Sequence, residues 1–561
     1  MPETTGANSN MTDESLVIRT RQLIESGDYA QARQALETHL SAKAGDARAL
    51  DLLCKLADHS GDYAHAADWL CRSLEIDTHN HRAYCFLGYV MCKLGQFEAG
   101  LECYDKAIAL DRAQPAYWCE RAAALAELGR HAQAVSAYEQ ALDLEPAYAD
   151  AHAHLGTSLL SLGQTDVAIA SFDQAIALDA ACVSAYLNRG NAYLEKQAFA
   201  NALADYDQAI ALQPSHALAY ANRAAVLKHL HRLDESLQSS DRAIALDPQY
   251  VDAQFNKSLT QLLRGDLPEG FRAYQVRWQT PTFAPIRRNF TQPLWLGESA
   301  IQGKRLLVHN EQGLGDSIQF CRYVSLAARA GAEVIYEVEA PLYDLFQSLE
   351  GVTALVRQRE PLPAFDLYCP VMSLPIAFNS TVQSILAPTP YLKAKPEKLA
   401  QWATRLGPRQ EPRIGLVWSG NATHKADQQR SIALGDFLNA LAPGLQYFSL
   451  QKDLRQADAQ TLAQAPHIRH FGAELTDFSD TAALCTHMDL VIAVDTSVAH
   501  LAGALGVPTW LLLPHLPDWR WLLDRSDSPW YPHMRLFRQE TAGNWKSVLQ
   551  SVRDQLAHKA W

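Results

Sequence analysis

The sequence contains no long apolar run, no block of basic residues and no pair of cysteines at metal-ligand spacing. No stretch approaches the roughly 18 apolar residues of a membrane-spanning helix, and residues 1–10 lack the features of a secretory signal, so we expect a cytoplasmic protein without a membrane span. The formal net charge of -13 argues against nucleic acid as a partner, because phosphate-backbone binding depends on clustered Lys and Arg. The ten scattered cysteines are expected to be small buried residues in a reducing compartment, with no metal bound.

A 34-residue period runs through the first half of the chain. The motif Ala-Ile-Ala-Leu-Asp and its close variants end at Asp111, Glu145, Asp179, Gln213 and Asp247. The same spacing falls on Gly27, Gly61, Gly95, Gly129, Gly163 and Gly265, with Gln197 and His231 at the two remaining steps. Small residues at these steps are expected to let the two helices of a unit approach closely. The period predicts about eight tandem helical hairpins.

These repeats resemble the tetratricopeptide repeat over residues 13–280, which implies an α-solenoid whose concave face holds a peptide or another protein. Asn188, Asn191 and Asn222 lie on the first helices of their units, where a ladder of amides could hydrogen-bond an extended acceptor. A solvated polar face explains the same residues equally well, and the repeats could instead be a spacer or a surface for oligomerisation. Residues 1–12 are expected to be disordered.

The pattern changes after Trp278. Residues 281–302 read as an irregular linker, and beyond it β-branched runs alternate with helical segments, which favours parallel α/β sheets. We expect strands at 305–310, 333–338, 413–418, 446–450, 490–494 and 509–513. They predict two doubly wound, Rossmann-like lobes, 303–400 and 401–561, with ligands at the carboxyl ends of the strands.

The first of three polar loops after these strands contains Gly313, Gly315 and Asp316. The glycines would let the backbone approach a ligand, and Asp316 is either a helix cap or a catalytic group. The second loop contains Ser419, Asn421, Lys425 and Arg430. These side chains suit a diphosphate as donors and countercharges, although a solvated surface loop has the same composition.

The third loop opens a helix at Asp495, Thr496 and Ser497, where unpaired N–H groups and the helix dipole favour an anion. His500 on that helix is either a ligand contact or a packed residue. Further on, Trp519 and Trp521 flank Arg520 and follow Asp518. Such aromatic side chains suit contact with a sugar or base, and a structural lid or hinge is the competing interpretation.

Three of these motifs together carry a resemblance: the Asp316 loop, the Ser419-Gly420 loop, and Asp495-Thr496 with His500 and the segment 503–508. Over about residues 300–540 they resemble the bacterial heptosyltransferase family. The resemblance implies a GT-B fold and an inverting, metal-independent transfer without a cofactor. It makes Asp316 the base that deprotonates the acceptor, and it places Thr496, Ser497 and His500 at the donor phosphates. The loop with Lys425 and Arg430 is longer than the family's turn, so which cation meets the diphosphate stays open.

A repeat solenoid fused to a GT-B unit is similar to protein O-glycosyltransferases, including the eukaryotic O-linked N-acetylglucosamine transferases and bacterial flagellin-modifying enzymes. We therefore expect a glycosyltransferase that moves a sugar from a nucleotide-sugar to a hydroxyl of an acceptor protein, flagellin-like or other, captured by the repeats. Two alternatives stay open. One is a non-catalytic scaffold or co-chaperone with a degenerate transferase lobe, and the other is a transferase that acts on a glycan or lipopolysaccharide.

Overall fold

The computed structural model describes residues 13–43, 45–385, 389–423 and 427–558. Contacts between residues divide the chain into two compact units, Met1–Asn222 and Arg223–Trp561. The segment 1–12, expected to be disordered, lies outside the described residues. Within the described ranges, no helix combines the length and the apolar character needed to cross a membrane.

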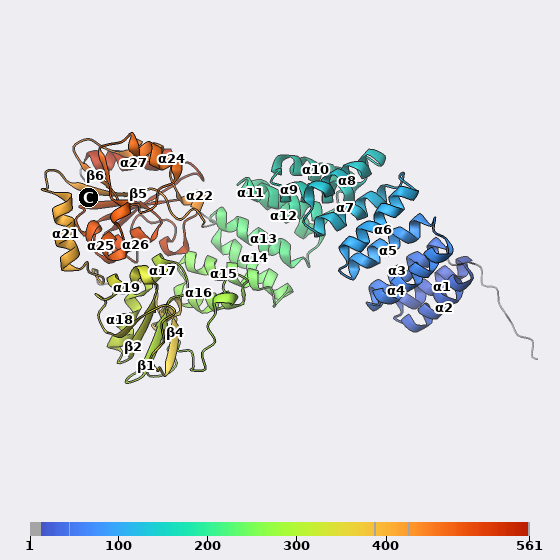
Figure 1. Ribbon diagram of the computed structural model, residues 1–561, viewed down its shortest axis with the longest axis horizontal. Helices are drawn as coiled ribbons and strands as arrows, with labels where there is room; N and C mark the ends of the chain where they lie inside the picture. Colours follow the sequence, from blue (N-terminus) through green and yellow to red (C-terminus); the bar gives the residue numbers. More distant parts are fainter. Residues whose placement is uncertain (1–12, 44, 386–388, 424–426, 559–561) are drawn as a thin grey trace, which may run out of the picture. The chain divides into compact units, whose positions relative to one another are not determined.

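The first unit is a row of antiparallel helix pairs (Figure 1). Its helices are α1 (Asp13–Glu25), α2 (Tyr29–Ala42), α3 (Ala47–Ser60), α4 (Tyr63–Ile76), α5 (His81–Lys93), α6 (Phe97–Leu110), α7 (Pro115–Glu127), α8 (His131–Leu144), α9 (Ala149–Ser161), α10 (Thr165–Leu178), α11 (Val183–Glu195) and α12 (Phe199–Leu212), followed by α13 (Ala217–His229), which crosses the boundary. The α-solenoid predicted from the period is confirmed.

The periodic glycines have a different role from the expected one. Gly61 and Gly95 adopt the left-handed backbone region at φ 74° and 76°, and a Cβ at either position would meet nothing within 4 Å. They make the turn between the helices of a pair rather than letting those helices approach. Gln197 takes the same backbone conformation at φ 58°, so the turn between the helices of that pair forms without glycine. Close approach occurs elsewhere, as at Gly156, where a Cβ would lie 2.6 Å from the Phe172 ring.

The cysteines are all free thiols. Five are buried, but Cys71 is exposed, so the expectation of small buried residues fails at that position. Cys71 lies on α4, whose buried face is formed by Ala66, Ala67, Leu70, Ser73 and Leu74. The position next to Leu70 points away from that face because successive helical residues are rotated by about 100°.

The second unit begins with the last repeat helices, α14 (Leu233–Leu246), α15 (Val251–Arg264) and α16 (Leu267–Ala273), and the 3-10 turn η1 (Tyr274–Gln279). Leu262, Leu267 and Phe271 from these helices pack in the same apolar core as the strands that follow. Burial of each such side chain stabilises the fold by about 1.5–3 kcal/mol. The end of the repeat array is therefore a structural part of the α/β unit.

The first lobe is a four-stranded parallel sheet in the order β3-β2-β1-β4. Its strands are β1 (Arg305–His309), β2 (Glu333–Val338), β3 (Val352–Arg357) and β4 (Leu367–Pro370), and its main helices are α17 (Leu314–Phe320), α18 (Arg322–Arg329) and α19 (Ala340–Phe346). These helices pack on one face of the sheet, whereas Phe290, Leu362 and Phe365 from irregular segments cover the other. The lobe is therefore not wound on both faces as expected.

The segment 281–302, expected as a linker, is tied to the same sheet. Leu294 forms a parallel bridge with Tyr368, and the Trp295 N–H donates to the Tyr368 carbonyl at 2.8 Å. The Trp295 side chain is buried in the core. This segment therefore extends the sheet beyond β4.

The second lobe is a six-stranded parallel sheet in the order β10-β9-β8-β5-β6-β7. Its strands are β5 (Arg413–Val417), β6 (Gln446–Ser449), β7 (Ile468–His470), β8 (Leu490–Val494), β9 (Thr509–Leu513) and β10 (Met534–Arg538). Alternate residues face opposite sides, so that Leu490, Ile492 and Val494 pack in one core and Val491 and Ala493 in the other. Helix α27 (Lys546–Ala557) covers the first face, and α25 (Phe478–Thr486) and α26 (Ser497–Ala504) cover the second (Figure 1).

Each sheet reverses its strand order at one point. In the first lobe the reversal lies between β1 and β4, and in the second it lies between β5 and β8. Loops leaving neighbouring strands in opposite directions open a crevice there, which is the usual ligand position in open α/β sheets. The three polar loops singled out from the sequence leave β1, β5 and β8.

Candidate functional site

A cavity of about 1670 Å³ lies within the second unit and is lined by loops of both lobes. The loops after β1 and β2 contribute from the first lobe, and those after β5, β6, β8 and β9 contribute from the second. The predicted residues that line it are Gly313, Gly315, Asp316, Ser419, Asn421, Arg430, Asp495, Thr496, Ser497, His500 and Trp519. Typical ligand pockets measure about 300–1,000 Å³, so this cavity has room for a nucleotide-sugar together with part of a second substrate.

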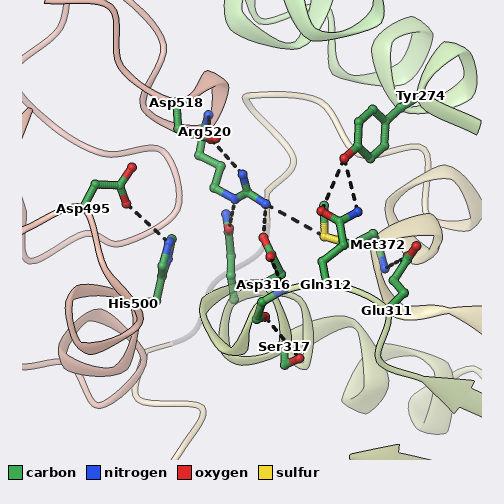
Figure 2. A network of polar contacts seen from close by, with 12 residues as sticks. Tyr274, Glu311, Gln312, Asp316, Ser317, Met372, Asp495, His500, Asp518 and Arg520 are labelled. Carbon is green, nitrogen blue, oxygen red and sulfur yellow. Dashed lines mark hydrogen bonds and ion pairs between the residues drawn. The ribbon is translucent and has the colours of Figure 1, made fainter. Parts of the chain in front are cut away.

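Asp316 lies in the first turn of α17, on the first-lobe side of the cavity (Figure 2). Its Oδ2 accepts the Gly313 N–H at 2.8 Å, so the carboxylate does cap the helix. Its Oδ1 forms an ion pair with the guanidinium of Arg520 from the second lobe. Because the Asp316 side chain is 20% exposed, it still reaches the cavity while both of its oxygens are held.

Arg520 is the centre of a polar cluster that joins the two lobes. Its Nη1 donates to Asp518 at 2.8 Å, and its Nε donates to the Gln319 Oε1 at 2.7 Å. Burial opposes the charged form, but Asp518 and Asp316 raise the pKa of Arg520 above its ordinary value. The cluster fixes the position of Asp316 relative to the second sheet.

The two glycines of the first loop line the cavity and also take part in local packing, and their approach to a ligand stays a prediction. Gly313 is the N-cap residue of α17, and its N–H is used by Asp316. A Cβ at Gly315 would lie 3.0 Å from the His500 ring and 3.4 Å from the Ser497 Cα. Glycine at this position therefore lets α17 and α26 pack end to end, which brings the Asp316 loop beside the Thr496 loop.

The second-lobe end of the cavity has polar atoms without partners. Among the described residues, the buried Thr496 Oγ1, Arg430 Nε and Gln451 Oε1 have no hydrogen-bond partner. All three residues line the cavity at the carboxyl ends of β5, β6 and β8. Each buried unsatisfied polar group costs about 1–3 kcal/mol. A ligand rich in hydrogen-bonding groups would recover that free energy.

The loop after β8 opens α26 with Thr496 at the N-cap and Ser497 as the first helical residue. The Thr496 side chain makes no capping bond, and Arg430 Nη1 donates to the Asp495 carbonyl at 2.9 Å. A guanidinium, two hydroxyls and the N-terminus of a helix thus share one end of the cavity. This combination is typical of anion binding.

The loop after β5 contributes two of the predicted residues in different ways. The Ser419 side chain is buried, and the Ser419 carbonyl accepts from Gln451 Nε2 at 2.9 Å. Asn421 is exposed, and its Oδ1 accepts from the N–H and hydroxyl of Thr423, both at 3.0 Å. The Asn421 oxygen therefore forms a local turn. Lys425 lies outside the described residues.

Asp495 lines the cavity and contacts two buried residues, His500 and Trp521. Burial and then the charge of Asp518 raise the pKa of Asp495 to about 6, and the Trp521 Nε1–H donates to its Oδ2 at 2.9 Å. His500 Nδ1 lies 2.9 Å from the Tyr531 hydroxyl. Burial, with Arg520 adding to it, holds the pKa of His500 well below its ordinary value. His500 is therefore neutral, which favours its interpretation as a packed residue.

Of the two tryptophans, one faces the cavity. Trp519 lines it with 6% of its surface exposed. Trp521 has no exposed surface and stacks on His500 with ring centroids 5.2 Å apart. Its interpretation as a sugar or base contact is therefore wrong for this conformation, because the ring supports Asp495 and His500 from behind.

The amides expected to bind an acceptor form hydrogen bonds to neighbouring side chains of the repeats. In the first unit, Asn191 Oδ1 accepts from the Tyr206 hydroxyl at 2.7 Å and from Asn222 Nδ2 at 3.0 Å. Asn188 Nδ2 donates to the Thr157 hydroxyl at 3.2 Å. The bonds of Asn188 and Asn222 link neighbouring repeats, and the Tyr206 bond lies within one helix pair. Acceptor binding by the three amides stays a prediction.

Sequence reasoning missed several cavity residues, among them three polar ones. Arg520 was noted only as a polar neighbour of the tryptophans, Gln451 was not singled out, and Lys228 comes from α13 in the repeats. Burial lowers the pKa of Lys228, and Asp518 partly opposes that shift. Gln451 directly follows an expected strand, so its position alone could have identified it. Within the described ranges, no cluster of three or more His, Cys, Asp or Glu side chains is arranged to hold a metal ion.

Family models confirm the class of protein that the first unit represents. A tetratricopeptide repeat model matches residues 153–217, and a second TPR repeat model matches residues 88–129 and 124–163. The chain is thus an array of tetratricopeptide repeats followed by an α/β region with parallel sheets.

A curated relative and several solved structures are similar to this chain. Protein FlbA of Caulobacter vibrioides (strain ATCC 19089 / CIP 103742 / CB 15) is 26% identical over 326 residues, which are 53% of this chain and 54% of FlbA. The chain therefore spans about half the length of that relative. YrrB, a TPR protein with an unusual peptide-binding site, is 22% identical with a TM-score of 0.30 and covers 34% of this chain and 100% of its own. Pseudomonas aeruginosa pilF is 20% identical with a TM-score of 0.34, and the match covers 38% of this chain and 96% of pilF.

Proposed function

We propose that this protein is a glycosyltransferase that moves a sugar from a nucleotide-sugar donor to a hydroxyl on an acceptor protein held by the repeats. The observation that carries the proposal is the composition of one cavity. The carboxylate of Asp316 lines this cavity from the point where the first sheet reverses its strand order. Arg430 and Thr496, the proposed anion-binding residues, line it from the corresponding point of the second sheet.

In the proposed reaction the nucleotide diphosphate binds at the second-lobe end. Arg430 supplies the countercharge, and the hydroxyls of Thr496 and Ser497 and the N-terminus of α26 donate hydrogen bonds to the phosphate oxygens. Negative charge grows on the diphosphate as the bond from the sugar to its phosphate oxygen breaks. These groups therefore stabilise the transition state more than the bound donor.

Asp316 takes the proton of the acceptor hydroxyl while the hydroxyl oxygen bonds to the anomeric carbon. One displacement of this kind inverts the configuration at that carbon, and the nucleoside diphosphate leaves. A carboxylate has about four lone-pair positions, so Asp316 can accept this proton while Gly313 and Arg520 hold its two oxygens. The mechanism requires only side chains and backbone groups that line the cavity.

The repeats also support the alternative of a scaffold. Tetratricopeptide repeats commonly bind other proteins, and a degenerate α/β region would then only dock partners. Thr496 Oγ1 and Gln451 Oε1, which have no hydrogen-bond partner in the part of the chain that the structure describes and line the cavity, favour the transferase because a bound ligand would supply the missing hydrogen bonds.

Transfer itself tests the proposal. The full-length protein is incubated with UDP-, GDP-, ADP-, CMP- and dTDP-linked sugars, and nucleotide release is measured with and without added flagellin-like protein. We expect release from one donor class, faster with acceptor, and a mass increase of one sugar on the acceptor. Absence of release from every donor, with no nucleotide bound, would support the scaffold instead. Transfer to a glycan or lipopolysaccharide but to no protein would reassign the acceptor.

A further inference from the structure

Helix α15 and the segment that follows it give the cavity an apolar part of its lining. Phe255, Leu259 and Leu263 recur at every fourth position of α15 and therefore lie on one face of that helix, and all three line the cavity. Phe283 and Ile286 from the following segment extend this surface. Ile286 is 48% exposed, so the surface continues to the cavity entrance. We call these five residues the α15 wall.

The α15 wall is rigidly joined to the loop that carries Asp316. Phe255 stacks on Tyr274 with ring centroids 5.6 Å apart, and the Tyr274 hydroxyl accepts from Gln312 Nε2 at 3.2 Å. Arg277, one helical turn further on, donates to both carboxylate oxygens of Glu311 at 3.0 and 2.9 Å. Figure 2 shows Gln312 beside Asp316, and Tyr274 hydrogen-bonded to Gln312. Glu311 and Gln312 belong to the Asp316 loop, so the wall begins where the proposed base is held.

Contacts connect three parts of the cavity lining, because the Asp316 loop meets α26 at Gly315 and meets Tyr274, which stacks on Phe255, at Gln312. Arg430 and Thr496 form a polar end, Asp316 and Arg520 lie at the junction of the lobes, and the α15 wall comes from the last repeat. A donor whose phosphates occupy the polar end places its sugar toward Asp316. The acceptor hydroxyl must approach Asp316 from the remaining side, which the α15 wall lines.

We propose that the α15 wall is the acceptor subsite, and that it selects a polypeptide segment in which a bulky apolar residue flanks the modified Ser or Thr. This proposal rests on the proposed function. The aliphatic side chains of Leu259 and Leu263 offer no hydrogen bond to the hydroxyls of a glycan. A peptide can bury an apolar side chain on the wall while its backbone bonds to polar groups such as Gln312. The wall also continues from the repeats, which commonly bind protein.

The size of the selection follows from the wall's chemistry. A substrate that has or lacks one apolar group bound in a hydrophobic pocket differs in kcat/KM by about 10- to 200-fold. A charge introduced at Leu259 would lie unpaired on the apolar surface and repel such a side chain. The effect is expected on acceptor use, because the proposed diphosphate residues belong to loops of the second lobe and Leu259 belongs to α15.

The test uses the full-length protein and short peptides with one Ser or Thr flanked by Leu, Phe, Gly or Asp. The wild type is expected to transfer sugar to Leu- and Phe-flanked peptides at least tenfold better, in kcat/KM, than to Gly- or Asp-flanked ones. Leu259→Asp is expected to abolish that preference, and Leu259→Met, which keeps volume and apolarity, to retain it. Ile76→Asp is the matched control, because Ile76 is 75% exposed on α4 in the first unit.

Each other outcome counts against a specific claim. Transfer without a preference for the flanking residue, or the same preference in Leu259→Asp, overturns the acceptor subsite while leaving the transferase intact. Transfer to a lipid-linked or glycan acceptor only overturns the peptide assignment. Failure of the wild type to release nucleotide from any donor overturns the proposed function. The acceptor subsite, which rests on that function, is then overturned as well.

Discussion

Arg520 and Asp316 are 204 residues apart in the sequence and form an ion pair between the two α/β lobes. The same guanidinium binds Asp518 at 2.8 Å. Two carboxylates thus share one buried cation at the point where the proposed chemistry occurs. Removal of the cation would leave both acids with an uncompensated charge, which makes this pair the natural place to test how the site is held.

Arg520→Gln is expected to destabilise the protein by about 3–5 kcal/mol, as for other buried ion pairs that lose one partner. Asp316→Asn combined with Arg520→Gln should recover part of that loss, because the unpaired charge at Asp316 is then absent. A double-mutant cycle of unfolding free energies measures the recovery. Strict additivity would show that the pair does not couple the lobes.

Asp316→Asn is expected to lower turnover at least a hundredfold and to change donor affinity by no more than a few fold, because the base acts only in the transfer step. Asparagine can still accept the Gly313 N–H, so the start of α17 is preserved. Asp436→Asn, at an exposed position on helix α23 (Leu434–Phe437), serves as the control. Undiminished turnover in Asp316→Asn would remove Asp316 from the role of base.

Arg430→Gln is expected to weaken nucleoside diphosphate binding about tenfold or more and to leave nucleoside binding nearly unchanged, since a charge-assisted hydrogen bond is worth about 1.5–3 kcal/mol. Asn421→Ala should change neither affinity by more than twofold, because its oxygen is already engaged by Thr423. Calorimetric titration gives both affinities. Equal losses for the diphosphate and the nucleoside would place Arg430 away from the phosphates.

Asp495 gives the protein a specific pH dependence. Its pKa is raised from 3.8 to about 6, so the folded state holds this proton more tightly than the unfolded state. The contribution of Asp495 to the free energy of unfolding is greatest below about pH 4. It falls as the pH rises from about 4 to about 6 and is constant at higher pH. Asp495→Asn keeps an acceptor for Trp521 and should gain on the order of 2 kcal/mol relative to wild type between pH 4 and 7. A pH-independent difference between the two proteins would contradict this assignment.

A chain that begins at Pro214 keeps α13 and the whole second unit. We expect it to fold, because α15 and α16 remain packed in the core of the first lobe, and to release nucleotide from the donor. Transfer to a full-length acceptor protein should fall at least tenfold. A cut at about residue 265 would remove Leu262 and Leu263 from that core and should prevent folding. Full transfer by the Pro214 chain would show that the first unit does not hold the acceptor.

The regular parts of the fold were predictable because local patterns determine them. The 34-residue period predicted the helix pairs, and three predicted strands, 333–338, 490–494 and 509–513, match β2, β8 and β9 at both ends. Strands β3, β4, β7 and β10 were not anticipated. All four lie at the edges of their sheets, and each contains exposed or partly buried residues, unlike the continuous buried runs of β5, β8 and β9.

The site was predictable only loop by loop. Asp316, Thr496 and Arg430 each follow a strand, and that position suffices to select them. The partner of Asp316 could not be inferred, since Arg520 reaches it through tertiary packing. The burial of Trp521 and the contribution of α15 have the same origin. Both depend on how helices from distant parts of the sequence pack around the two sheets.

Nucleotide binding to the full-length protein tests the central claim most directly. Thermal unfolding is followed with UDP, GDP, ADP, CMP and dTDP, and again with Thr496→Ala. Ligand at a hundred times its Kd stabilises the folded state by about 2.7 kcal/mol, which gives a clear rise in Tm. We expect a selective rise with one nucleotide and a smaller one in the variant. No rise with any of them, or an equal rise in Thr496→Ala, would contradict a donor site at this end of the cavity.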